Sequence, residues 1–124
     1  MKNLLVIAFM FIGGLCMAQD QTSPVWPGCE GSDNVKKCFN QKFSQFVRSN
    51  YEYPKNDKGE YVRGKVTVSF TVNKEGEVVI NSVEGPKPEV NQAAREMLEK
   101  MPKMEPGTLG GEVDDRKFTN TFKF

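Results

Sequence analysis

The sequence contains no histidine among its 124 residues. Histidine is the most common general base in enzymes, the usual activator of a nucleophile and the most common metal ligand. A glycine-rich phosphate-binding pattern is missing as well. The adjacent acids Asp114 and Asp115 would point to opposite sides of a strand, which makes them a poor catalytic pair. We therefore expect neither enzymatic activity nor a metal or cofactor site.

An excess of charge of either sign is also missing. The 17 basic and 16 acidic residues leave a formal net charge of +1, so no overall field would attract nucleic acid. The 38% hydrophobic and 27% charged residues are typical of a soluble globular protein. The length suits a single domain with a modest core.

The sequence has no apolar run long enough for a typical membrane helix, which needs about 20 residues. Its longest run is residues 4–15 (LLVIAFMFIGGL), which follows Lys2 and precedes small residues suited to cleavage before Gln19. This pattern predicts that residues 1–18 are a signal peptide and that the protein is exported. The alternative is that the segment stays uncleaved and anchors the protein in the inner membrane.

Three cysteines are present, and Cys16 lies within the predicted signal peptide. After export to an oxidising compartment, Cys29 and Cys38 are an even pair, which favours a disulfide. The alternative is a free or redox-active pair. Closing a loop of about ten residues stabilises a protein by ~2.7 kcal/mol in the chain-entropy model.

A strong strand pattern occupies residues 65–83 (KVTVSFTVNKEGEVVINSV). Its first half alternates apolar and polar residues, which places one set on each face of a strand. Gly76 supplies the backbone freedom for a tight turn, and β-branched residues follow it. The segment predicts an antiparallel hairpin with one buried face.

Two further segments show helical spacing. Residues 35–50 follow good N-cap residues and carry an apolar stripe of Val35, Phe39, Phe43, Phe46 and Val47. Residues 89–101 repeat the pattern, with Pro88 suited to the first helical turn.

The remaining segments are a leader, a loop and a final strand. Prolines and glycines predict that residues 19–31 lack regular structure, although Trp26 is expected to pack onto the domain. Residues 102–115 (PKMEPGTLGGEVDD) are predicted as a loop. Residues 116–124 alternate, with the phenylalanines on one face. The order helix, strand, strand, helix, strand predicts an α+β fold, in which a small three-stranded antiparallel sheet is packed against helices.

The sequence closely resembles the C-terminal domain of TonB-family energy transducers. The resemblance rests on Tyr53-Pro54, GKVTVSFTV from Gly64, EGEV, and MPKMEPGTLGGEV, and it covers residues 53–124. We divide the chain into a signal peptide (1–18), a leader (19–34) and a TonB C-terminal-like domain (35–124). Met104 stands where the family motif has a tryptophan, and the proline usual near the end of the last strand is absent. We expect these departures to affect pocket shape rather than the fold.

The resemblance implies a function in the periplasm. TonB proteins act on outer-membrane transporters that import siderophores and other scarce nutrients. Their C-terminal domain binds a short transporter segment, the TonB box, as an added strand beside its own last strand, a mode known as β-augmentation. Carried over by position, the partner-binding residues are Tyr53, Pro54, Arg116, Lys117, Phe118, Thr119, Asn120, Thr121 and Phe122.

Other hypotheses stay open at this point. Residues 19–34 would span at most about 55 Å when fully extended, so we expect a stand-alone periplasmic relative rather than a complete energy transducer. The exposed last strand could instead pair with a second copy in a homodimer. A third hypothesis is an envelope structural or adaptor protein that binds peptidoglycan.

Overall fold

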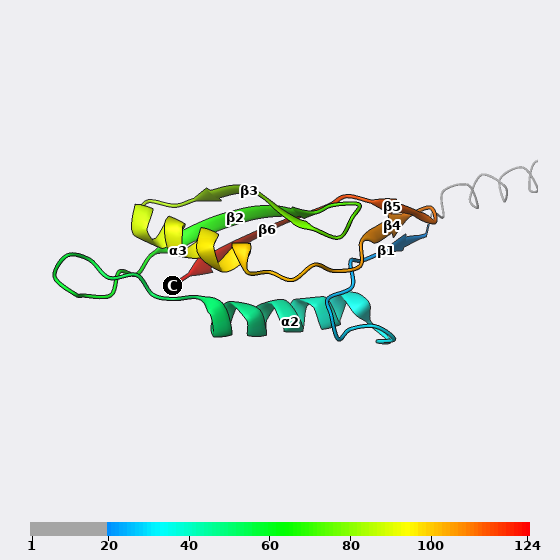
Figure 1. Ribbon diagram of the computed structural model, residues 1–124, viewed down its shortest axis with the longest axis horizontal. Helices are drawn as coiled ribbons and strands as arrows, with labels where there is room; N and C mark the ends of the chain where they lie inside the picture. Colours follow the sequence, from blue (N-terminus) through cyan, green and yellow to red (C-terminus); the bar gives the residue numbers. More distant parts are fainter. Residues whose placement is uncertain (1–19) are drawn as a thin grey trace, which may run out of the picture.

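The alternating hairpin forms the centre of the structure. In the computed structural model, which describes residues 20–124, β2 (Lys65–Val72) pairs antiparallel with β3 (Val78–Glu84) on one side. On its other side β2 pairs antiparallel with β6 (Arg116–Lys123). The sheet order is β3-β2-β6 (Figure 1), which confirms the predicted three-stranded antiparallel sheet. The predicted signal peptide lies outside the described residues.

One face of β2 is fully buried. Its inward residues have no exposed surface: Val66, Val68, Phe70 and Val72. Burying an apolar side chain of this size contributes about 1.5–3 kcal/mol. The period-two pattern of the sequence therefore marks the core face of the sheet, as predicted.

The turn between β2 and β3 depends on Gly76. Its φ of +81° is rarely adopted by other residues, and a Cβ atom there would lie 1.7 Å from the carbonyl oxygen of Met104. The backbone N–H of Met104 donates a hydrogen bond to the Gly76 carbonyl at 2.9 Å. The hairpin turn is thus closed against the segment that follows α3.

Two helices cover the buried face, at the positions predicted. α2 (Val35–Asn50) lies on the β6 side of the sheet (Figure 1). The Phe39 ring of α2 stacks on Phe118 of β6, with centroids 4.9 Å apart. α3 (Pro88–Glu99) packs over β3 and β2. Its buried residues are Val90, Ala93, Ala94, Met97 and Leu98. Pro88 stands in the first turn of α3 as expected.

A second small sheet lies at the end of the molecule where β6 begins (Figure 1). Its strands are β1 (Gln21–Thr22), β4 (Gly107–Leu109) and β5 (Glu112–Asp114), in the order β1-β4-β5. The predictions of an unstructured leader and of a loop over residues 102–115 were therefore wrong in these segments.

The reason for this error is that the second sheet depends on long-range pairing. β1 and β4 are far apart in the sequence, and they meet through the Thr22 and Thr108 hydroxyls, 2.6 Å apart. Gly110 and Gly111 both have positive φ, which suits the two-residue reversal between β4 and β5. Glycine and proline residues in a sequence indicate where helices and strands are interrupted. They do not indicate that short segments such as β1 and β4 pair with each other across the chain.

The leader is attached to the domain by apolar contacts. Trp26 is only 6% exposed, and its ring lies 5.5 Å from that of Phe39 and 5.6 Å from that of Phe46. Val25 and Glu105 exchange two backbone hydrogen bonds, of 2.9 and 3.2 Å. The expectation that Trp26 packs onto the domain is confirmed.

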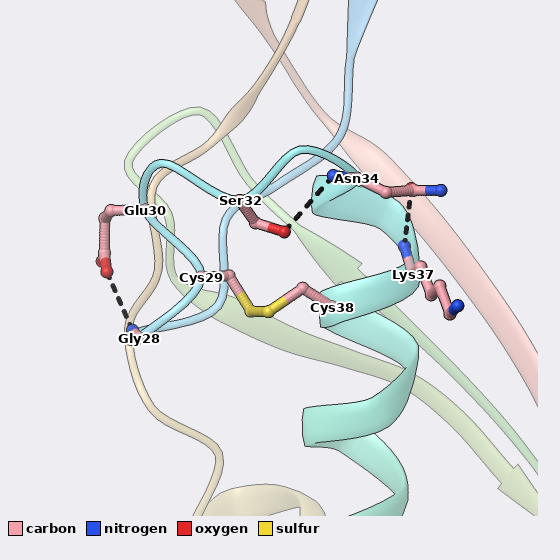
Figure 2. The surroundings of a disulfide bond; sticks show 7 residues. All are labelled: Gly28, Cys29, Glu30, Ser32, Asn34, Lys37 and Cys38. Atoms are coloured by element: carbon pink, nitrogen blue, oxygen red, sulfur yellow. Dashed lines mark hydrogen bonds between the residues drawn. A yellow bond between two sulfur atoms is a disulfide. The ribbon is translucent and has the colours of Figure 1, made fainter.

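A disulfide joins the leader to α2, as the sequence predicts. Cys29, which is buried, is bonded to Cys38 in the first turns of the helix (Figure 2). The side chain of Asn34 caps the same end of α2 by accepting a hydrogen bond from the Lys37 N–H at 3.0 Å. The start of α2 is therefore held both by a local cap and by a covalent link.

Replacing both Cys29 and Cys38 with alanine is expected to lower the free energy of unfolding by about 2.7 kcal/mol, because the unfolded chain regains the freedom of a loop of about ten residues. Urea unfolding followed by the fluorescence of Trp26, the single tryptophan, measures the change. The wild-type protein under a reducing agent is the control and should show a matching loss. An unchanged unfolding midpoint in both samples would contradict the prediction.

Candidate functional site

β6 has a strand on one side only within residues 20–124. Gly64 and Phe124 exchange two backbone hydrogen bonds, of 3.0 and 2.9 Å, at the end of its pairing with β2. In an antiparallel ladder every second residue bonds to the partner strand in this way. The unbroken register therefore turns the backbone groups of the even-numbered β6 residues toward β2.

The odd-numbered residues of β6 consequently direct their backbone N–H and C=O groups to the open side. They are Lys117, Thr119, Thr121 and Lys123. We call this row of groups the β6 edge. The side chains of these residues are exposed, whereas the alternate side chains are half-buried on the face that α2 covers.

The opposite edge of the sheet is less regular. The register between β2 and β3 shifts, so that Ser69 faces Ser82 while Phe70 faces Ile80, and Asn81 is left as a bulged residue. Bulges disturb a strand's pairing and protect sheet edges from further strands. β6 pairs through eight residues without such a shift. The β6 edge is therefore the regular open edge of this sheet.

The structure divides the predicted partner-binding residues. Those from Arg116 to Phe122 all lie in β6, but only Lys117, Thr119 and Thr121 belong to the β6 edge. Lys123 also belongs to the β6 edge and was not predicted. Which β6 residues face outward is set by the hydrogen bonds between Gly64 and Phe124, and no residue pattern in the sequence indicates this.

Tyr53 and Pro54 lie at the C-terminal end of β6. The centroid of the Tyr53 ring is 6.3 Å from that of Phe124. The Tyr51 ring contacts both, with centroids 3.6 Å from Phe124 and 5.1 Å from Tyr53, so the three rings form an aromatic cluster. The Pro54 carbonyl accepts a hydrogen bond from the Val62 N–H at 2.8 Å. The structure brings Tyr53 and Pro54 near the end of β6 and away from its start at Arg116.

At the start of β6 lies an open cavity of about 530 Å³, which we call the N-terminal groove. It is lined by Gln21, Ser23, Lys36, Phe39, Asn40, Arg116, Lys117 and Phe118. Three of these residues are basic and none is acidic. Only those from β6 were predicted as site residues, since no local motif indicates that the leader and α2 meet the last strand.

Tyr51 combines burial with an unsatisfied polar group. Its buried hydroxyl has no hydrogen-bond partner among residues 20–124. Burial, and secondarily the nearby Tyr53, raise the pKa of Tyr51 above its ordinary value of 10.0. The ring therefore contributes packing at the end of β6, while the hydroxyl adds no hydrogen bond.

The described part of the chain contains no group of three or more His, Cys, Asp or Glu residues placed to hold a metal ion. Across residues 20–124, neither helix combines the length and the apolar character needed to cross a bilayer.

A protein-family comparison bears on this arrangement. The family described as "Gram-negative bacterial TonB protein C-terminal" matches residues 49–124, which include the central sheet, α3 and the β6 edge. The chain belongs to the TonB C-terminal family. This family is a non-enzymatic domain of the Gram-negative envelope, linked to TonB-dependent transport and to outer-membrane transporters in general. No curated protein matches the chain.

Two features distinguish this chain from the matched family pattern. Met104, at the place of the family's tryptophan, is 5% exposed and lies in the core beside the Gly76 turn. β1 and most of α2 precede the matched residues. These two elements belong to an N-terminal extension of the family domain, and with Ser23 this extension supplies five of the eight residues that line the N-terminal groove.

The Tyr51→Phe variant should be at least as stable as the wild type at neutral pH, because the buried hydroxyl that it removes has no hydrogen-bond partner among residues 20–124. In the wild type, the raised pKa means that the stability contributed by Tyr51 is fully present below about pH 10 and is lost as the pH rises through the folded-state pKa. The variant should therefore lose less stability than the wild type between about pH 8 and about pH 11. Urea unfolding at several pH values measures this difference, and parallel losses would contradict it.

Proposed function

We propose that this protein is a periplasmic binding module that recognises an extended segment of an outer-membrane TonB-dependent transporter by adding it as a strand to the β6 edge. The module would thereby serve the uptake of siderophores or other nutrients. The observation that carries the proposal is the unbroken β6 edge. One side of β6 is fully paired with β2, and the backbone groups on its other side have no neighbouring strand within residues 20–124.

The chemistry of the edge suits an extended peptide. Backbone groups from Lys117 to Lys123 recur at every second residue and span about 20 Å at ~3.3 Å per residue. A visiting strand of about seven residues would satisfy them with main-chain hydrogen bonds, and neighbouring pockets would select its side chains. The fixed ladder with β2 means that the edge needs little reorganisation before binding.

The β6 edge would also suit a second copy of the chain, which could pair with it about a two-fold axis. Light scattering after size-exclusion chromatography distinguishes a dimer from a peptide-binding monomer. The peptidoglycan hypothesis predicts instead that the protein sediments with purified sacculi. Together with a peptide titration, these two experiments distinguish a transporter segment, a second copy of the chain and peptidoglycan as the partner.

Thr119→Pro is expected to abolish transporter-peptide binding while the domain stays folded. The Thr119 N–H belongs to the β6 edge, so proline removes a donor that the visiting strand needs but no bond to β2. Asn120→Pro is the matched control. Its N–H faces β2, so this variant should be markedly less stable. Thr119→Ala keeps the N–H and should bind as the wild type does.

The measurement is an NMR titration of backbone amides with synthetic N-terminal segments of outer-membrane transporters from the same cell. Binding should shift the amides of residues 116–124 in the wild type and in Thr119→Ala, but not in Thr119→Pro. Absence of shifts in the wild type at millimolar peptide, or retained affinity in a folded Thr119→Pro, would count against the proposed function.

A further inference from the structure

We infer that the N-terminal groove binds a carboxylate side chain of the segment that adds to the β6 edge, and that the N-terminal extension thereby sets the selectivity of the module. This inference rests on the proposed function and specifies its ligand. The groove lies where the β6 edge begins, because Lys117 both lines the groove and supplies the first outward backbone groups of that edge.

The charge of the groove is local and of one sign. Lys36 comes from the first turn of α2 and Arg116 from the start of β6. Lys117 borders the groove, but its exposed side chain alternates to the other face of β6. Among residues 20–124, no acidic residue lines the groove, although the whole chain carries a formal net charge of only +1. A carboxylate is the side chain in a peptide that complements such a site, and charge-assisted hydrogen bonds are the stronger kind.

The Arg116 side chain is held in place by the second sheet. Its guanidinium donates a hydrogen bond to the Thr108 carbonyl at 3.4 Å, and it passes so close to Gly107 that a Cβ there would lie 3.1 Å from it. A guanidinium has five N–H donors, so others remain for a ligand. The second sheet therefore restricts the orientation of one cation of the groove.

The wall of the groove is apolar and rigid. Phe39 and Phe118, which both line it, are stacked with an interplanar angle of 9°. An apolar wall lowers the local dielectric constant and strengthens the attraction between a carboxylate and the cations. The polar groups of Gln21, Ser23 and Asn40 complete the lining.

The geometry of an added strand indicates which of its side chains reaches the groove. Side chains of a strand alternate between faces, and the groove lies between β6 and α2, on the face that the helices cover. The carboxylate must therefore belong to an inward-facing residue beside the start of β6. The remainder of the segment would continue along the β6 edge toward the aromatic cluster at Phe124.

The source of this selectivity is the extension. Five of the eight lining residues precede residue 49, where the family match begins. The extension is held against the domain by the Cys29–Cys38 disulfide and by buried Trp26. A family domain without these residues would keep the β6 edge but would lack Lys36 and the wall formed by Phe39.

The test uses blocked peptides of about nine alternating threonine and valine residues, each with a glutamate or a glutamine at one end. The glutamate or glutamine is placed at the N-terminal end in one pair of peptides and at the C-terminal end in a second pair. In one of the two pairs, we expect the wild-type chain to bind the glutamate peptide about tenfold more tightly than the glutamine peptide. The Lys36→Glu variant should lose or reverse this preference, chiefly through weaker binding of the glutamate peptide. An acidic residue in the first turn of α2 is compatible with the helix dipole, so the variant should fold.

Lys37→Glu is the matched control, because it changes the net charge equally. Its side chain lines a different surface of α2, with Gln41 and Ser44. It should keep the preference for glutamate. An equal loss in Lys36→Glu and Lys37→Glu would mean that the preference comes from long-range charge, which overturns the groove as the binding site.

The outcomes separate this inference from the proposed function. Amide shifts along residues 116–124 with equal affinity for both peptides would overturn the carboxylate site and leave strand addition standing. Absence of binding by every peptide at millimolar concentration, including the transporter segments, would overturn both. A tenfold preference that Lys36→Glu abolishes and Lys37→Glu retains would support both.

Discussion

The burial of one face of β2 is the constraint on which the rest of this structure depends. Its four inward side chains have no exposed surface, and every major element contributes to covering them. β3 and β6 flank β2, α3 and α2 cover it, and the Gly76 turn closes against the segment after α3. Because β2 must be hydrogen-bonded on both sides to be buried in this way, it becomes the central strand.

The central place of β2 leads directly to the candidate site. Once β2 pairs with two neighbours, β3 and β6 are the edges of the sheet, and the bulge at Asn81 disturbs only the first of them. The bonds between Gly64 and Phe124 then set which β6 residues face outward. The function proposed for this TonB-like domain therefore depends less on which side chains are exposed than on which β6 residues direct their backbone N–H and C=O groups outward.

The N-terminal extension adds a second layer to this arrangement. The disulfide and Trp26 hold β1 and α2 against the family domain, and the stacking of Phe39 on Phe118 places α2 beside the last strand. This packing brings Lys36 to the same groove as Arg116 and Lys117, although Lys36 precedes them by about 80 residues in the chain. The β6 edge, which belongs to the family domain, is thus combined with the N-terminal groove, which depends on the extension.

The sequence by itself determined β2, β3, β6, α2, α3 and the Cys29–Cys38 pair, because alternation, helical spacing and cysteine count are local patterns with direct physical causes. Tertiary structure alone decided the second sheet, the outward row from Lys117 to Lys123, and the groove. Two-residue strands such as β1 are too short to carry a period, and they exist only through distant partners such as Thr108. Likewise, Lys36 and Asn40 resemble ordinary exposed helix residues until the packing of α2 brings them beside β6.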